Sequence, residues 1–469
     1  MKGIPFATAL LLCASATGAQ QAPADRFVGL WQGALAVNAM RLRLAFEIRR
    51  DSSGGLTGVM TSIDQGNARI NGAVTVAGDT LVVTMPTALA RYRATLSAAG
   101  DSLHGTFTQG AGEFPLSMGR TNAIAAVRRP QEPKPPFPYH TEDVTIPSVA
   151  GVQLGCTLDV PQGSGPFPAA VLATGSGPQD RDENLLGHKP FLVIADYLAR
   201  RGIATLRCDD RGVGRSTGNY ASASAADFAD DAEAGVKYLQ TRHEIAPNKI
   251  GIIGHSEGGM IGPMVAARSH DIAFVVMMAG PGIRGDSVVM LQGQLIAKAS
   301  GAPPAVLEQQ QRAHRALFAA ILASHDSADA ATRIRQAEDS LIATFPASQQ
   351  PTVRRQLAQG RAQLMSREFQ SIIRYDPRPL LTQVRVPVLA LNGTLDLQVP
   401  YAEDLAGIAS ALAAAGNRDV TTVALAGLNH LFQPATTGAP SEYGEIETTI
   451  APVALQTIAD WIEKRFGNR

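Results

Sequence analysis

Apolar and charged residues alternate between residues 41 and 49, and this period of two predicts a half-buried antiparallel strand. Its apolar face is formed by Leu42, Leu44, Phe46 and Ile48, and its polar face by Arg41, Arg43, Glu47 and Arg49. Gly-Asp turns begin at residues 78 and 100, and each is followed by a further apolar run. These features predict an all-β domain, a small meander or barrel, over residues 25–122. It holds no clustered acid, base and nucleophile, and His104 is expected on its surface, so we assign it no chemistry.

A proline-rich segment follows the predicted β-domain. Residues 128–138 contain five prolines in eleven positions. Proline lacks an N–H and cannot sustain a helix or a central strand. We therefore expect an extended, semi-rigid linker at residues 123–139, which marks the domain boundary.

From residue 140 onward, short apolar strands alternate with amphipathic helices. Strands are expected at residues 169–174, 202–207, 249–254, 274–279, 386–391 and 421–425. Helices are expected at residues 190–201, 227–241 and 260–267, and a closing helix is marked by Leu455, Ile458, Trp461 and Ile462. This alternation predicts a mostly parallel sheet covered by helices on both faces, with ligands at the carboxyl ends of its strands. The fold class is therefore α/β, over residues 140–469.

One stretch, residues 286–376, interrupts the alternation. It is rich in Ala, Gln and Arg and carries the helical pairs Leu317/Ile321 and Phe318/Leu322. Two to four helices inserted between two strands are expected to form a cap over the strand ends. A purely structural excursion is the alternative. The apolar residues of the cap are mostly Ala, Leu and Ile, which favours a small pocket.

Charge and composition exclude some classes of partner. The 469 residues include 41 Lys and Arg and 41 Asp and Glu, so no net charge favours nucleic acid or an anionic membrane. No run apart from the N-terminus approaches the roughly 20 apolar residues of a membrane span. We expect no stable membrane insertion, and the sequence does not predict an oligomeric state.

The N-terminus has the pattern of a cleavable secretory signal. Lys2 precedes an apolar run at residues 4–12 and small residues at 14–19. We expect residues 1–19 to be a signal peptide, cleaved after Ala16 or Ala19, and the chain to be secreted or periplasmic. Beyond it only Cys156 and Cys208 remain, on segments expected to be neighbouring strands. Two free buried thiols are the favoured interpretation, and a single bridge is the alternative.

The motif Gly254-His255-Ser256-Glu257-Gly258 lies between a predicted strand and a predicted helix. A G-x-S-x-G in that setting is a nucleophile elbow, a tight turn that holds the serine at the edge of the sheet. The glycines are required because side chains at 254 or 258 would collide with the neighbouring strand and helix. Ser256 is therefore the predicted nucleophile.

A serine hydroxyl needs a base, and the base needs an acid that fixes its tautomer. Asp396 follows the strand expected at residues 386–391, and His430 follows the one expected at 421–425, which gives the order Ser, Asp, His. We predict His430 as the base and Asp396 as the acid. His255 beside the serine and Asp376 before a strand are the weaker alternatives. The other histidines of this domain, His188, His243, His270, His314 and His325, are expected to be solvated.

An oxyanion formed during acyl transfer needs two backbone donors. One is the N–H of Glu257, and the other comes from the loop that begins at Gly175. Pro178 has no N–H, so Ser176 is the predicted donor and Gly177 the second choice. No Lys-Ser/Thr follows this loop, and the chain has no H-E-x-x-H or C-x-x-C motif, so neither a cofactor nor a metal is expected. Residues 207–216, which include Asp209 and Asp210, are expected to form a structural turn with locally paired charges.

Together, these motifs resemble the α/β-hydrolase superfamily, and most of all bacterial carboxylesterases close to its serine-aminopeptidase-like branch. The resemblance rests on residues 175–182, 210–216 and 254–259 and on Asn429-His430, and it covers about two thirds of the chain. It implies an α/β-hydrolase fold with a helical cap, hydrolysis of small-molecule short-acyl esters, and no cofactor. The N-terminal β-domain is outside the shared fold. An aminopeptidase-like peptidase or amidase with the same triad is the alternative function.

Overall fold

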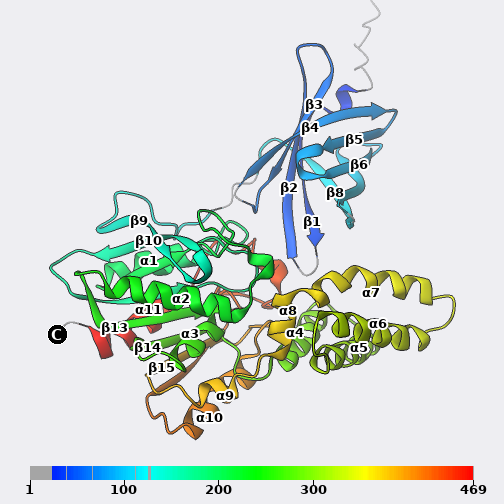
Figure 1. Cartoon of the computed structure of the whole chain (residues 1–469). Coiled ribbons are helices and arrows are strands. Elements are labelled where there is room, and N and C mark those ends of the chain that lie inside the picture. The colour runs from blue at the N-terminus through cyan, green and yellow to red at the C-terminus, as the bar shows by residue number, and fades with distance from the viewer. Residues whose placement is uncertain (1–23, 38–39, 66, 111, 125–127, 468–469) are drawn as a thin grey trace, which may run out of the picture. The chain divides into compact units, whose positions relative to one another are not determined.

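The computed structural model describes residues 24–467 except 38–39, 66, 111 and 125–127 (Figure 1). The predicted signal peptide, residues 1–19, lies outside the described residues. The chain divides into two compact units, one containing Leu42–Ala126 and the other Val127–Arg469. Each is described by itself.

The first unit is a closed barrel of eight strands in sequential order, with β1 paired to β8. The strands are β1 (Gly29–Val37), β2 (Met40–Arg50), β3 (Leu56–Ser62), β4 (Ala68–Ala77), β5 (Thr80–Met85), β6 (Ala90–Leu96), β7 (Ser102–Gln109) and β8 (Gly112–Thr121). Closure leaves no edge strand open to pairing with another chain. Phe46 of the predicted strand stacks on Tyr92 inside the barrel, at 5.3 Å between ring centroids. The all-β prediction is confirmed, and His104 is exposed as expected.

The second unit is built on an eight-stranded sheet in the order β16-β15-β14-β13-β11-β12-β10-β9. Its strands are β9 (Tyr139–Pro147), β10 (Gln153–Pro161), β11 (Phe167–Ala173), β12 (Ala204–Cys208), β13 (Ile245–His255), β14 (Phe274–Met278), β15 (Val388–Gly393) and β16 (Val420–Leu425). The six predicted strands are all present and pair in parallel. β9, which we did not predict, and β10, of which only a strand around Cys156 was expected, add an antiparallel edge.

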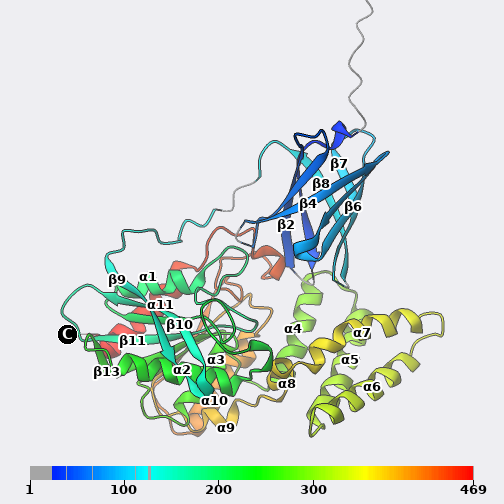
Figure 2. The same ribbon diagram turned by 45° about the horizontal axis from the view of Figure 1, so that its top comes forward.

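Helices cover both faces of this sheet, as Figures 1 and 2 show. One face packs against α1 (Pro190–Arg200) and α11 (Pro452–Phe466), and the other against α2 (Ala225–Gln240), α3 (Gly258–Ala266) and α10 (Tyr401–Ala414). Neighbouring residues of β11 alternate between the faces: Val171 contributes to one core and Leu172 to the other. The central strands are apolar throughout because both faces are covered. Within the residues described, no helix is both long and apolar enough to span a membrane.

The segment between β14 and β15 is helical, as predicted, but it contains more helices than the two to four expected. It forms α4 (Gly285–Ala299), α5 (Pro304–Leu322), α6 (Ser327–Ala343), α7 (Gln350–Met365) and α8 (Arg367–Arg374), followed by the short α9 (Arg378–Leu381). We call α4–α8 the cap. Leu317, Phe318 and Ile321 are buried in a core of its own. The cap is therefore a folded insertion with its own hydrophobic centre.

The proline-rich segment contains turns, one of them closed by a bond from Glu132 N–H to the Arg129 carbonyl (3.1 Å), and it is fastened to the second unit. The Arg129 guanidinium donates to the carbonyls of Leu186 (2.8 Å) and Gly444 (3.1 Å). The Gln131 side chain bonds to the backbone of Ile450 as donor and acceptor. This part of the expected linker is therefore anchored to the second unit.

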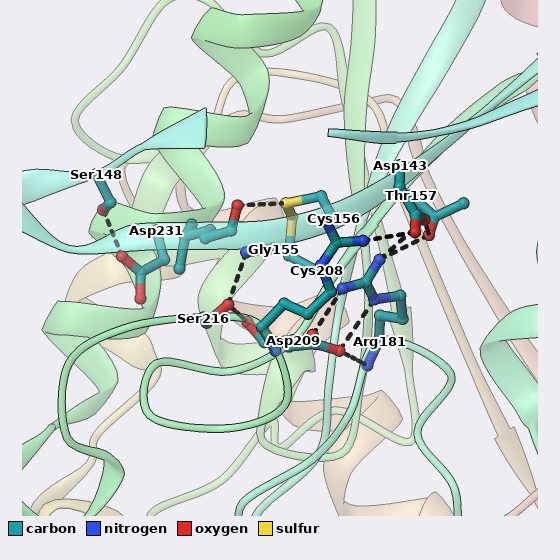
Figure 3. The surroundings of a disulfide bond; sticks show 12 residues. Asp143, Ser148, Gly155, Cys156, Thr157, Arg181, Cys208, Asp209, Ser216 and Asp231 are labelled. Carbon is teal, nitrogen blue, oxygen red and sulfur yellow. Dashed lines mark hydrogen bonds and ion pairs between the residues drawn. A yellow bond between two sulfur atoms is a disulfide. The ribbon is translucent and has the colours of Figure 1, made fainter. Parts of the chain in front are cut away.

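Cys156 and Cys208 form a disulfide, so the favoured interpretation of two free thiols is wrong. The two residues face each other in the antiparallel pair of β10 and β12, with 4.0 Å between their Cα atoms. The sequence could not reveal this register, because the two cysteines are 52 residues apart and no local pattern fixes how their strands align. Figure 3 shows Arg181 beside the bridge, where it bonds to Asp209 and Thr157.

The disulfide should contribute measurably to stability. It closes a loop of 52 residues, for which chain entropy in the unfolded state corresponds to about 4 kcal/mol. We expect the double variant Cys156→Ala/Cys208→Ala to unfold at lower urea concentration than the oxidised wild type. Dithiothreitol should lower the midpoint of the wild type and leave that of the double variant unchanged. A wild-type midpoint insensitive to reductant would show that the bridge does not form.

Candidate active site

Ser256 occupies a tight turn between β13 and α3. Its φ of 54° lies in the left-handed region, which is unusual for a residue with a side chain. A Cβ on Gly254 would lie 1.9 Å from the carbonyl oxygen of Gly258, and a Cβ on Gly258 would lie 2.0 Å from that of Ala173. Only glycine fits at either position. The turn therefore has the strand-to-helix geometry of a nucleophile elbow.

His430 and Asp396 are hydrogen-bonded to each other. The imidazole Nδ1 lies 2.9 Å from Asp396 Oδ2, and both side chains are buried. Asp396 Oδ1 accepts the backbone N–H groups of Gln398 (2.8 Å) and Val399 (2.9 Å). The carboxylate is thus held in one orientation, and its bond to Nδ1 leaves His430 Nε2 available as a base.

Ser256 and His430 line the same cavity, of about 130 Å³. The loop after β11 contributes Gly175 and Ser176 to its wall, and Gln398 comes from the loop after β15. The structure thus brings the predicted nucleophile and base to one place, with the acid behind the base. Asp376, the alternative acid, instead binds the Arg378 guanidinium (2.9 Å) at the surface.

Two further histidines, His255 and His188, are buried next to this site. His255 is buried, with Nδ1 2.9 Å from Glu183 Oε1 and Nε2 3.0 Å from the carbonyl oxygen of His430. Burial opposes its charged form, but the charge and hydrogen bond of Glu183 outweigh burial and raise the pKa of His255. With both ring nitrogens engaged, His255 holds the backbone of His430 and does not serve as the base.

His188 is also buried, contrary to the expectation that it is solvated. Its Nδ1 lies 3.0 Å from Thr449 Oγ1 and its Nε2 lies 2.9 Å from the carbonyl oxygen of Tyr443. It lines the catalytic cavity together with Thr449. No sequence pattern marks this role, because its partners lie some 260 residues further along the chain. His243, His270 and His325 are exposed as expected, whereas His314 is partly buried.

The loop after β11 is held at several points around Ser176. Gly175 N–H donates to Glu183 Oε1 (2.7 Å), and Gly177 N–H donates to the Tyr220 hydroxyl (2.8 Å) and to Glu368 Oε1 (3.0 Å). Gly177, the second choice of donor, is therefore already engaged. Within the described chain, no protein acceptor takes the N–H of Ser176 or that of Glu257. Both remain candidates for the oxyanion donors.

The charged turn at residues 207–216 anchors this loop. Asp209 accepts the Arg181 guanidinium (2.7 Å) and its backbone N–H (2.9 Å), and Asp210 accepts the N–H of Gln179 (2.9 Å). The expected structural role fits, although the partner of Asp209 comes from the neighbouring loop. Arg211 likewise reaches α2, where it binds Asp231 (2.7 Å). Figure 3 shows Arg181 between Asp209 and Thr157.

The side chain of Glu257 is buried and carries an unusual carboxyl group. Its Oε1 has no hydrogen-bond partner among the described residues. Burial, together with the negative charges of Glu368 and Asp210, raises the pKa of Glu257 to about 8. Burial also raises the pKa of Asp210 to about 7. Glu257 therefore remains protonated at neutral pH.

The loop after β11 carries three acids, Asp180, Asp182 and Glu183, and they do not form one cluster at the site. Asp182 pairs with Arg207, and Asp180 accepts the backbone N–H groups of Asp182 and Asn184. Glu183 alone of the three lines the catalytic cavity. In the described part of the chain, no group of three or more His, Cys, Asp or Glu is arranged to bind a metal.

The cap reaches the site at two points that the sequence did not reveal. Gln292 of α4 donates to Gln398 Oε1 (3.2 Å), next to the candidate acid. Glu368 of α8 accepts the bond from Gly177 in the candidate oxyanion loop. Residues 368 and 177 are far apart in sequence, so no local motif could have connected them.

Comparison with known proteins places this arrangement in a family. The family described as serine aminopeptidase, S33, matches residues 191–433, which is more than half of the chain, and the chain belongs to that family. The match extends from α1 to the loop that follows His430. The predicted resemblance is thereby confirmed.

Individual known proteins are similar to parts of the chain. Esterase EstD of Thermotoga maritima is 35% identical over 146 residues, so the chain matches about a third (34%) of that relative's length and 31% of its own. An esterase from Pyrococcus furiosus is 15% identical, with a TM-score of 0.43 over 74% of this chain and 100% of that one. The α/β-hydrolase GrgF from Penicillium sp. sh18 is 16% identical, with a TM-score of 0.44 over 70% and 100% of the two chains.

The triad geometry makes a paired prediction about two aspartates. Asp396→Asn should lower kcat by about ten-thousand-fold, because the amide no longer fixes the histidine tautomer. Asp376→Asn removes a surface ion pair and should leave kcat close to that of the wild type. Steady-state hydrolysis of p-nitrophenyl acetate by both variants measures this. Severe loss in Asp376→Asn with an active Asp396→Asn would reassign the acid.

Glu257 makes a prediction about stability and pH. Between its ordinary pKa of 4.5 and about 8, the folded chain holds a proton that the unfolded chain has released. Raising the pH through this window therefore favours unfolding, by about 1.4 kcal/mol per pH unit for one group. In urea titrations, Glu257→Gln should match the wild type near pH 5 and exceed its stability near pH 8.

The exposed Glu308→Gln is the matched control, and it should follow the wild type at every pH. Equal stability of Glu257→Gln and wild type at pH 8 would contradict a buried, unpaired carboxyl.

Proposed function

We propose that this chain is a serine carboxylesterase that hydrolyses short-acyl esters of small molecules. The observation that carries the proposal is the cavity that Ser256 and His430 share, with Asp396 Oδ2 2.9 Å from His430 Nδ1. Family membership and the match to an esterase support it.

The proposed reaction begins with Ser256. His430 Nε2 takes the proton of the hydroxyl while its oxygen attacks the ester carbonyl, and Asp396 stabilises the imidazolium that forms. The oxyanion is stabilised by the N–H groups of Ser176 and Glu257. His430 then gives its proton to the departing alcohol, which leaves an acyl group on Ser256. Water, activated by the same histidine, releases the acid. No cofactor takes part.

The size of the cavity favours small acyl groups. About 130 Å³ is well below the 300–1,000 Å³ typical of sites for drug-sized ligands. Each methylene that an apolar pocket accepts or rejects is worth about 1–3 kcal/mol. Acetyl to butyryl groups should therefore be preferred to long chains.

We further propose that the chain acts in the periplasm or outside the cell. The pattern of residues 1–19 supports export. The Cys156–Cys208 disulfide agrees with an oxidising compartment.

The alternative is a peptidase or amidase with the same triad, which the family's description as a serine aminopeptidase favours. A free amine would need carboxylates facing the catalytic cavity. Glu183 is the single acid among its described lining residues; its Oε1 is shared by Gly175 and His255, and its Oε2 is buried without a partner, so the cavity offers one carboxylate and no cluster. The ester reaction therefore fits the cavity better.

A substrate panel decides between the two functions. p-Nitrophenyl esters of two to twelve carbons and aminoacyl p-nitroanilides should be compared under the same conditions. We expect the highest kcat/KM on acetyl to butyryl esters, and a loss of about a million-fold in kcat for Ser256→Ala. A higher kcat/KM on the anilides would contradict the proposed esterase function and support the peptidase alternative.

A further inference from the structure

The cap and the candidate oxyanion loop meet at one carboxylate, that of Glu368 in the first turn of α8. Its Oε1 accepts two hydrogen bonds, from Gly177 N–H (3.0 Å) and from the Tyr220 hydroxyl (2.9 Å). Gly177 N–H also reaches the Tyr220 oxygen (2.8 Å), which closes a triangle of three groups. The three residues come from the cap, from the loop after β11 and from the turn before α2.

This triangle lies next to the residue that should bind the oxyanion. Gly177 directly follows Ser176, whose N–H is the candidate donor. The chain on the other side of Ser176 is fixed by the bond from Gly175 to Glu183 (2.7 Å). The orientation of Ser176 is therefore set by Glu183 on one side, and by Tyr220 together with Glu368 of the cap on the other.

A carboxylate is well suited to this anchor. Hydrogen bonds to ionised acceptors are roughly twice as strong as neutral ones. Gly177 itself has a φ of 91°, a conformation that glycine adopts without strain and that an outside contact must select. Because the backbone at Gly177 is conformationally free, a fixed hydrogen-bond partner is needed to align the neighbouring N–H of Ser176 before the reaction.

We infer that Glu368 is a positioning residue, through which the docked cap holds the candidate oxyanion loop in its reactive conformation. The inference rests on the proposed acyl transfer at Ser256 and adds a role for the cap in the chemical step. Glu368 touches no reacting atom. Its effect is exerted through Gly177 on the N–H of Ser176.

The neighbouring residue offers a matched control. Arg367 also ties α8 to the turn before α2, by a bond to the carbonyl oxygen of Ser222 (3.0 Å), but among the described residues it makes no hydrogen bond to the loop after β11. If Glu368 merely fastens the cap, then Arg367→Ala and Glu368→Ala should have similar effects. If Glu368 positions the oxyanion donor, their effects on kcat should differ.

The experiment compares Glu368→Ala, Glu368→Gln, Tyr220→Phe and Arg367→Ala on p-nitrophenyl acetate. Glu368→Ala should lower kcat by about 10- to 100-fold with little change in KM, because the misplaced donor is felt chiefly in the transition state. Glu368→Gln keeps an acceptor oxygen and should recover most of kcat. Tyr220→Phe should fall between the two. Arg367→Ala should stay within about two-fold of the wild type.

A second readout separates this inference from the choice of substrate. The rate of phosphonylation of Ser256 by a fluorophosphonate also depends on the oxyanion donors, but not on whether the natural substrate is an ester. This rate should fall in Glu368→Ala and be restored in Glu368→Gln. Wild-type rates in a folded Glu368→Ala, or equal losses in Glu368→Ala and Arg367→Ala, would overturn the inference while leaving the esterase proposal intact. If the probe does not label Ser256 in the wild type, both the inference about Glu368 and the esterase proposal are wrong.

Discussion

The candidate site depends on the close contact between backbones at the end of β13. The strand, the turn and the first residues of α3 approach so tightly that Gly254 and Gly258 have no room for a side chain. Ser256 adopts its left-handed conformation because these contacts leave no other path for the chain. The strain of this conformation is confined to one residue, and the burial of apolar side chains on both faces of the sheet offsets it. A looser turn would return the serine to ordinary backbone geometry and move its hydroxyl away from His430.

The order of the strands explains how distant residues converge on this turn. β11, β13, β14, β15 and β16 are consecutive neighbours in the sheet, and all run in parallel. Their carboxyl ends therefore lie along one edge, where the loops supply Ser176, Ser256, Asp396 and His430. The supporting contacts are equally non-local: His255 carries the backbone of His430, and Gln398 links the loop of the acid to the cap.

The parts of this arrangement that sequence could predict are those with a local physical cause. A central parallel strand is apolar on both sides, so all six were recognisable, and the residues just beyond their ends were the natural candidates for the triad. The barrel was visible because its strand β2 alternates between an enclosed face and a solvated one. Gly254 and Gly258 were informative because steric exclusion acts within a few residues.

The parts that sequence missed depend on contacts between distant segments. β10 is buried almost throughout and lies between two antiparallel neighbours, so it has no alternation, and the register that pairs Cys156 with Cys208 was invisible. His188 is polar, and its burial depends on partners near residues 443–449. Glu368 has no motif at all, and its role follows from the packing of α8 against the loop after β11.

The proposed mechanism depends on Ser256 as the nucleophile that carries the acyl group. Peptide mapping by mass spectrometry after treatment with a fluorophosphonate tests it most directly, because the adduct identifies the residue that attacks. We expect a single adduct on the peptide containing Ser256, and we expect it to be lost when His430 is replaced by alanine. An adduct on another serine, or full labelling of His430→Ala, would contradict it.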